Sequence, residues 1–144
     1  MAHLCEAALV TCEDFRLHQR KGGGNLIGEF IASLEVDCDL ITRGGCIQDL
    51  VRPKPGFDDS LLRDLTVSVE LHQVGTIHLV GHEDCGAYGH FGFEDKEVEI
   101  LQHYKDLREA RSILTDKFPD VTVKLHFGKL KEGSSENYEI ESLE

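Results

Sequence analysis

Three short apolar runs constrain the fold of this 144-residue chain more than any other feature of its sequence. They comprise residues 7–11, 40–42 and 77–81. The continuous run at residues 7–11 is typical of a strand that is buried on both faces, as in a parallel sheet, and the other two also predict strands. A fourth run, residues 121–127, alternates apolar and polar side chains, which predicts a strand with two unlike faces.

Helical patterns separate these runs. Asn25 can cap a helix over residues 26–34, a second helix is predicted from Asp58 or Asp59 to about residue 73, and a third covers residues 96–118. Alternation of strands and helices is typical of an α/β fold, in which a mostly parallel, Rossmann-like sheet is flanked by helices. Residues 138–140 could add an edge strand. No repeat or boundary divides the chain, so we expect a single domain over residues 1–144.

The charge balance excludes some partners. Lys and Arg number 15 against 27 Asp and Glu, which gives a formal net charge of −12. Nucleic acid and anionic membrane surfaces both favour a basic partner, so neither is expected. No apolar run approaches the roughly 20 residues of a membrane-spanning helix. The N-terminus lacks the basic region of a signal peptide, and we therefore expect a cytoplasmic protein.

The chain contains five cysteines, an odd number that makes a poor disulfide framework. In a reducing compartment, cysteines are more often packed thiols, metal ligands or nucleophiles. Cys5, Cys38 and Cys46 are interpreted as packed thiols. Cys12 and Cys85 remain as candidates for chemistry.

Cys12 directly follows the first apolar run, and His82 and Cys85 follow the third. Parallel α/β sheets bind ligands beyond the carboxyl ends of their strands, where the strand order reverses. If these two strands are neighbours, two sulfurs and one imidazole nitrogen converge, and this donor set suits Zn²⁺. Three protein ligands leave the fourth tetrahedral position open, which is the pattern of catalytic zinc sites.

Asp14 and Arg16 lie beside the first of these candidate ligands. Arg16 can hold the Asp14 carboxylate ionised and oriented through a bidentate contact. Asp14 could then accept a hydrogen bond from zinc-bound water or hydroxide, or it could occupy the fourth position itself. Zinc lowers the pKa of its water toward about 7, which makes hydroxide available near neutrality.

The pattern Cys12-x-Asp14-x-Arg16 followed by His82-x-x-Cys85 resembles the signature of the β-class carbonic anhydrases. Residues 39–45 and 74–87 also resemble segments of that family. The resemblance implies a sheet of order 2-1-3-4 with a last antiparallel strand. It further implies zinc on Cys12, His82 and Cys85, a catalytic Asp14–Arg16 dyad, and a homodimer or higher assembly. The implied reaction is the reversible hydration of CO2 to bicarbonate by zinc-bound hydroxide.

Arg43, Gly44 and Gly45 follow the second apolar run and are candidates for substrate binding. The alternative for Arg43 is a structural role, and the two glycines could simply turn the chain. Tyr88 and His90 could relay protons or could serve packing and solvation.

Three other functions remain open at this point. The same zinc site could hydrolyse carbon disulfide or carbonyl sulfide. The domain could instead be a non-catalytic zinc sensor that Asp14 closes, or a thiol redox protein with a Cys12–Cys85 disulfide and no metal.

Overall fold

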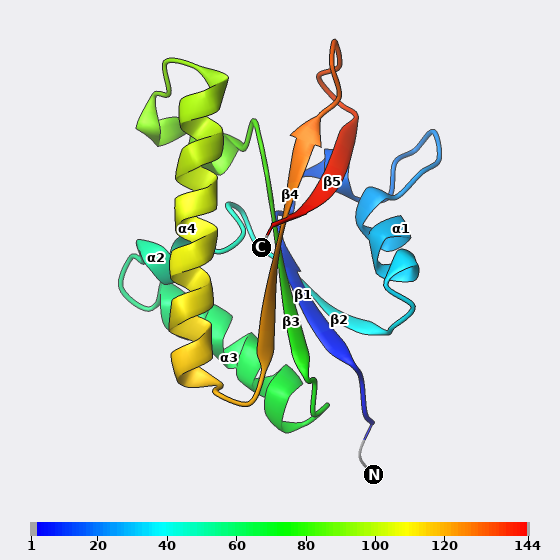
Figure 1. Ribbon diagram of the computed structural model, residues 1–144, viewed down its shortest axis with the longest axis vertical. Coiled ribbons are helices and arrows are strands. Elements are labelled where there is room, and N and C mark those ends of the chain that lie inside the picture. The colour runs from blue at the N-terminus through cyan, green and yellow to red at the C-terminus, as the bar shows by residue number, and fades with distance from the viewer. Residues whose placement is uncertain (1–2, 144) are drawn as a thin grey trace.

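A five-stranded sheet forms the centre of the computed structural model, which describes residues 3–143 (Figure 1). The strand order is β2-β1-β3-β4-β5. The first four strands run parallel, and β5 pairs antiparallel with β4. The strands are β1 (Ala7–Thr11), β2 (Cys38–Thr42), β3 (Thr76–His82), β4 (Thr122–Leu130) and β5 (Tyr138–Leu143). This topology confirms the predicted fold class and strand order.

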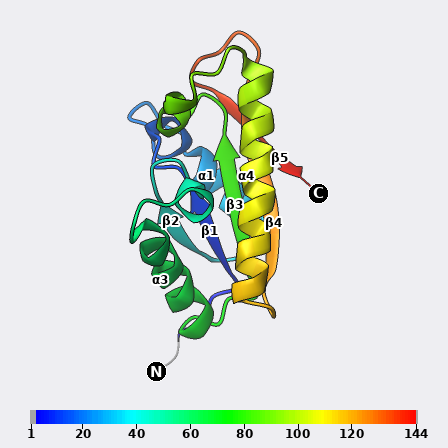
Figure 2. The same cartoon turned by 90° about the vertical axis from the view of Figure 1, so that its left-hand side faces the viewer.

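Helices cover both faces of the sheet. Figure 1 shows α1 (Leu26–Ser33) on one face and α2 (Gln48–Val51), α3 (Phe57–Glu70) and α4 (Lys96–Lys117) on the other. Figure 2 views the second face, where α3 and α4 lie in front of the strands. Two short 3-10 segments, η1 (Phe15–Leu17) and η2 (Gly86–Phe91), follow β1 and β3. None of the helices within residues 3–143 has the length and apolar composition that a membrane span requires.

The sheet separates two apolar cores because successive residues of a strand point to opposite faces. Val10 and Leu79 belong to the core beneath α3 and α4, whereas their neighbours Leu9 and Val80 belong to the core beneath α1. All five residues of β1 are buried. The unbroken apolar run that predicted this strand therefore reflects packing on both faces.

Several element boundaries differ from the sequence-based expectation. Helix α2 lies between the second predicted strand and the second predicted helix, where no element was predicted. Helix α3 begins two or three residues earlier than a cap at Asp58 or Asp59 would place it, and its N-cap is Gly56, which adopts a left-handed conformation with φ of 85°. Asp58 and Asp59 instead lie in the first turn, where carboxylates interact favourably with the helix dipole. This helix ends at Glu70, short of the predicted residue 73.

A buried histidine pair lies on the α1 face of the sheet. His78 Nδ1 and His126 Nε2 are 2.9 Å apart, and His126 Nδ1 is 3.0 Å from Ser142 Oγ. The edge of the Phe30 ring of α1 packs against His126. Burial lowers the pKa of His126 to about 4, and His78 and Lys124 reinforce this effect. His78 is likewise buried.

This pair makes the stability of the fold depend on pH. An unfolded histidine takes up a proton near its ordinary pKa of 6.5, whereas folded His126 resists protonation until about pH 4. The free energy of unfolding is therefore unaffected by His126 above pH 6.5 and decreases as the pH falls toward 4. At pH 5 the decrease amounts to about 2 kcal/mol. Urea unfolding of the native chain and of a His126→Gln variant at pH 7 and pH 5 measures it. The variant should lose less stability on acidification, and equal losses would contradict the assignment.

Candidate metal centre

The carboxyl ends of β1 and β3 bring the three predicted zinc ligands together. These two strands are parallel neighbours, Cys12 directly follows β1, and His82 is the last residue of β3. The Cys12 and Cys85 sulfurs are 3.9 Å apart. All three ligand atoms, one from each residue, lie within 4.8 Å of one another, and all three residues are buried. The site therefore occupies the edge at which α/β sheets bind ligands.

The His82 imidazole is held through one ring nitrogen, Nδ1, and its other nitrogen, Nε2, is available to bind a ligand. Its Nδ1 lies 2.8 Å from the Glu83 carbonyl oxygen and 3.3 Å from the Tyr138 hydroxyl oxygen. The Glu83 carbonyl can only accept, which assigns the proton to Nδ1 and leaves a lone pair on Nε2. This Nε2 is buried and has no hydrogen-bond partner among residues 3–143. Metal-binding histidines are typically held in this way through their other ring nitrogen.

The two thiols also suit a metal. The pKa of Cys12 is lowered to about 4, chiefly because the Cys85 thiol can donate a hydrogen bond to its thiolate, with further support from His82 and the Gly45 amide. The same contact and burial raise the pKa of Cys85. Two sulfurs bound tetrahedrally at about 2.3 Å would lie roughly 3.8 Å apart. The observed sulfur separation and the unpartnered His82 nitrogen therefore fit a zinc ion with one further position.

Asp14 and Arg16 form the predicted pair directly beside this cluster. Arg16 Nε donates to Asp14 Oδ1 at 3.1 Å, and Arg16 Nη2 donates to Asp14 Oδ2 at 2.8 Å. The Asp14 carboxylate also accepts the Arg16 backbone N–H and so caps η1. These contacts hold the pKa of Asp14 below its usual range, with Arg16 as the main cause. Asp14 is consequently an ionised hydrogen-bond acceptor.

Arg16 is itself fixed by segments that are distant in sequence. Its Nη1 donates to Asp84 Oδ2 at 2.9 Å and to the Ser135 carbonyl at 3.0 Å, and its Nη2 donates to the Asp84 carbonyl at 2.8 Å. The guanidinium also lies 5.3 Å from the centre of the Tyr138 ring. The dyad therefore connects β1, the loop after β3 and the β4–β5 hairpin.

A small cavity of about 10 Å³ adjoins His82 and Cys85, two of the three candidate metal ligands. Its lining is Gly45, Cys46, Ile47, Gly81, His82, Cys85, Tyr88, His103 and Leu107. Gly45 is required at this wall because its φ is 83° and a Cβ atom there would lie 2.7 Å from Gln48 Nε2. The sequence did not predict that Ile47, His103 and Leu107 line this cavity, since no local pattern distinguishes them from ordinary core residues. Only the folded topology brings them beside His82.

Helix α4 supports this cavity through buried polar contacts. Asp106 is fully buried and accepts hydrogen bonds from Tyr88, Arg52 and Gln102. Glu99 accepts from the Cys85 backbone N–H at 3.3 Å, and its Oε2 is 3.1 Å from His103 Nε2. Tyr88 is thus a buried wall residue that is held by a carboxylate. His90 is exposed, and its Nδ1 lies 3.1 Å from the Ala87 carbonyl.

The three substrate-binding candidates that follow β2 differ in their surroundings. Gly45 lines the cavity, whereas Arg43 and Gly44 are not among its lining residues. Arg43 Nη2 donates to Asp49 Oδ2 at 2.7 Å, and its Nη1 donates to Ser60 Oγ at 3.2 Å. These contacts attach the end of β2 to α2 and α3 and favour the structural alternative for Arg43. A Cβ atom at Gly44 would lie 3.0 Å from a Glu13 carboxylate oxygen, so its small size accommodates that side chain.

The remaining cysteines agree with the packing interpretation. Cys46 is buried, and Cys5 and Cys38 are partly buried. No cysteine within residues 3–143 forms a disulfide. Burial raises the pKa of Cys46, which keeps its thiol neutral beside the cavity.

Comparison with known sequences identifies the family. Residues 3–133 match the profile of a family described as "Putative carbonic anhydrase". An uncharacterized protein of Rickettsia conorii is 30% identical over 139 residues, covering 93% of this chain and 73% of that protein. An uncharacterized protein of Rickettsia bellii is 31% identical over 120 residues, covering 80% of this chain and 71% of that protein.

Solved structures show the same fold at low sequence identity. Carbonic anhydrase from Streptococcus mutans has a TM-score of 0.59 at 17% identity, covering 96% of this chain and 81% of that one. A tetrameric β-carbonic anhydrase of Sordaria macrospora has a TM-score of 0.59 at 15% identity, covering 98% and 81%. A carbon disulfide hydrolase in its apo form has a TM-score of 0.53 at 16% identity, covering 90% and 76%. The chain therefore belongs to the family described as "Putative carbonic anhydrase", and it has the fold of the β-carbonic anhydrases at low sequence identity.

Proposed function

We propose that the chain catalyses the reversible hydration of CO2 to bicarbonate at a zinc ion held by Cys12, His82 and Cys85. The observation that carries this proposal is that His82, whose buried Nε2 has no partner among the described residues, offers a ring nitrogen within 4.8 Å of two cysteine sulfurs. Membership of the carbonic anhydrase family supports the same reaction. When bound, zinc lowers the pKa of a water molecule toward about 7 and thereby supplies a nucleophile near neutral pH.

The chain's own residues would position that nucleophile. Asp14 is ionised by its contact with Arg16 and can only accept hydrogen bonds, so its carboxylate would fix the orientation of a neighbouring O–H group. Arg16 in turn prevents Asp14 from rotating, because it contacts both carboxylate oxygens. Glu83 and Tyr138 hold the His82 ring in place. Asp14 is thus proposed as the catalytic residue and Arg16 as its positioning residue.

The small cavity beside His82 and Cys85 is proposed to receive the substrate. Its volume of about 10 Å³ is close to that of a single water-sized site, so the walls would have to move to admit CO2, and would have to move further for either sulfur-containing gas. CO2 is the smallest of the three candidate substrates because sulfur is larger than oxygen. Ile47 and Leu107 present apolar surface that suits a neutral molecule. The cavity therefore favours CO2 over carbon disulfide and carbonyl sulfide.

Stopped-flow measurement of CO2 hydration on zinc-loaded protein tests this proposal. We expect a rate above that of buffer between pH 7 and 9, and no such rate after zinc is removed by a chelator. Sulfide release from carbon disulfide or carbonyl sulfide, measured on the same preparation, should be much slower. Fast sulfide release with little CO2 hydration would instead favour the hydrolase alternative, and inactivity toward all three gases at one zinc per chain would favour the sensor alternative.

We further propose that the protein assembles as a homodimer or higher homo-oligomer. The Sordaria macrospora neighbour is described as tetrameric. Strand β2 lies at the edge of the sheet, and its Leu40 side chain is 47% exposed. An edge strand with an exposed apolar side chain is suited to contact with a second copy.

A further inference from the structure

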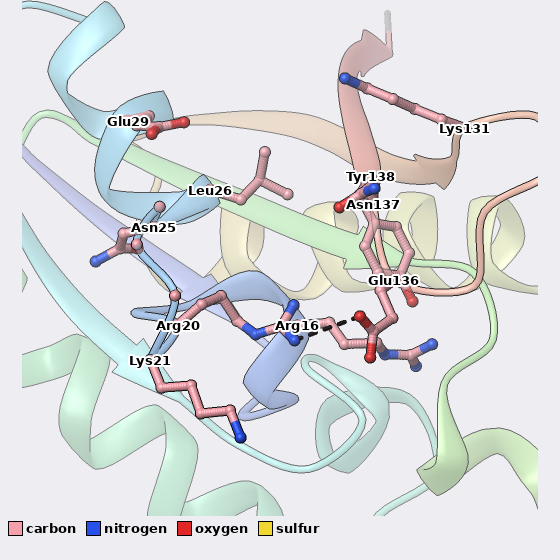
Figure 3. Close-up of a pocket in the computed structure, with 13 residues that line it drawn as sticks. Arg16, Arg20, Lys21, Asn25, Leu26, Glu29, Lys131, Glu136, Asn137 and Tyr138 are labelled. Atoms are coloured by element: carbon pink, nitrogen blue, oxygen red, sulfur yellow. Dashed lines mark ion pairs between the residues drawn. The ribbon is translucent and has the colours of Figure 1, made fainter.

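A second pocket lies outside the metal centre, between residues 16–29 and the β4–β5 hairpin (Figure 3). Its volume is about 510 Å³. Sites for small organic molecules are typically ~300–1,000 Å³. We refer to this pocket, lined by residues 16, 20–26, 29, 131 and 136–138, as the hairpin groove. It shares Arg16 with the catalytic dyad but contains none of the three metal ligands.

The charge of the hairpin groove is opposite to that of the whole chain. Its lining includes four cationic side chains against two carboxylates, whereas the chain carries 15 cations against 27 carboxylates. The cations are Arg16, Arg20, Lys21 and Lys131, and the carboxylates are Glu29 and Glu136. Exposed charges act over roughly 8 Å at physiological ionic strength, so a local excess of cations can attract an anion to a chain that repels it overall.

Two of these cations are available to a ligand. Lys21 and Lys131 are exposed, and neither side chain forms an ion pair or hydrogen bond with another residue in the described part of the chain. In Figure 3 they extend from opposite sides of the groove. Arg20 and Glu136 form an ion pair of 3.6 Å whose carboxylate side is 57% exposed. Such exposed pairs contribute about 0–1 kcal/mol, so this one can open for a competing anion.

The walls of the groove leave room for a ligand to approach the backbone. Gly22, Gly23 and Gly24 line it, and a Cβ atom added to any of them would meet nothing within 4 Å. Their small size is therefore not required by packing inside this chain. Gly23 and Gly24 also adopt left-handed conformations with φ of 97° and 89°. Leu26 and the ring of Tyr138 add apolar surface between the charged groups.

We propose that the hairpin groove binds a small organic molecule that carries a phosphate or carboxylate group. Lys21 and Lys131 contact the anionic group, Arg20 exchanges Glu136 for it, and Leu26 and Tyr138 contact the apolar part. Arg16 keeps its bonds to Asp14 and Asp84 and forms the floor. This proposal does not require the zinc site, although a ligand in the groove would lie against the residue that orients Asp14.

Titration of ¹⁵N-labelled protein followed by NMR tests this site. The probes are pyrophosphate and citrate, each added at constant ionic strength against sodium chloride. We expect saturable shifts of the backbone amides of residues 22–24 and 131–137 with at least one probe, and the tighter probe identifies the anionic group. The double variant Lys21→Gln, Lys131→Gln should weaken binding by about tenfold or more. The matched control is Lys105→Gln, an exposed lysine of α4 outside the groove, which should leave binding unchanged.

Three results would overturn the proposal. The first is a linear, unsaturated response to both probes. The second is a set of shifts that lies outside the two groove segments. The third is an equal loss of affinity in the Lys105→Gln control, which would indicate nonspecific attraction by surface charge. Because the zinc-free protein gives the same readout, failure here is distinct from failure of the proposed CO2 hydration.

Discussion

Replacing His82 with Gln is expected to reduce bound zinc from one ion per chain to a small fraction of that and to abolish CO2 hydration. The substitution removes the only nitrogen ligand of the cluster and leaves two sulfurs that cannot hold a catalytic ion alone. Loss of an outer-shell partner already weakens metal binding by roughly 10- to 100-fold. Loss of a ligand itself should exceed that range. Metal analysis after dialysis, together with stopped-flow kinetics, measures both effects.

His90→Gln is the matched control for this experiment. His90 lies only a short distance along the chain from His82, but it is exposed and is not part of the cluster. The control should retain one zinc per chain and the native rate. Retention of zinc by His82→Gln would show that the ion binds elsewhere. Loss of zinc in both variants would show that binding depends on histidines in general rather than on this geometry.

Replacing Asp14 with Asn is expected to lower kcat by about 100-fold while zinc remains bound. Asparagine keeps the size of the side chain but loses the ionised carboxylate, and one acceptor oxygen becomes a donor amide facing Arg16. Cys12, His82 and Cys85 are unchanged, so the metal content should not fall. Kinetics and metal analysis on the same samples separate a loss of chemistry from a loss of zinc.

Asp84→Asn serves as a comparison for Asp14→Asn, because Asp84 contacts the same arginine but a smaller loss of activity is expected. Asp84 also accepts a hydrogen bond from Arg16, but its side chain is 66% exposed. Exposed ion pairs contribute about 1 kcal/mol or less, so the expected loss of activity is less than about fivefold. An Asp14→Asn variant as active as Asp84→Asn would contradict a catalytic role for Asp14. Parallel loss of zinc would instead make Asp14 a metal ligand.

The sequence predicted most of the fold because the strands and long helices carry strong local patterns. The buried run of β1 and the alternating pattern of β4 both became strands of the single sheet. The convergence of Cys12, His82 and Cys85 was also predictable, because they lie at or just past the ends of strands that a parallel sheet places side by side. The dyad was predictable from the two-residue spacing of Asp14 and Arg16, which contact each other directly.

The parts that sequence reasoning missed depend on contacts between distant segments. Short helix α2 has only four residues and no side-chain cap, so its local signal is weak. The cavity walls Ile47, His103 and Leu107 come from separate elements that meet only after folding. The Arg16 contacts to Asp84 and Ser135 span 68 and 119 residues. Glycines 22–24 line a pocket whose other wall is the distant hairpin, and no local pattern in the sequence predicts that pocket.

The proposed metal centre consists of two thiolates and one imidazole, with a fourth position open to solvent. The most direct measurement is the absorption spectrum of the cobalt-substituted protein. We predict charge-transfer bands from two thiolates at one cobalt per chain, and ligand-field bands that change with pH and with small anions such as azide. A spectrum that shows thiolate ligation but does not respond to pH or anions would mean that the fourth position is closed, and a spectrum without thiolate bands would contradict the metal centre itself.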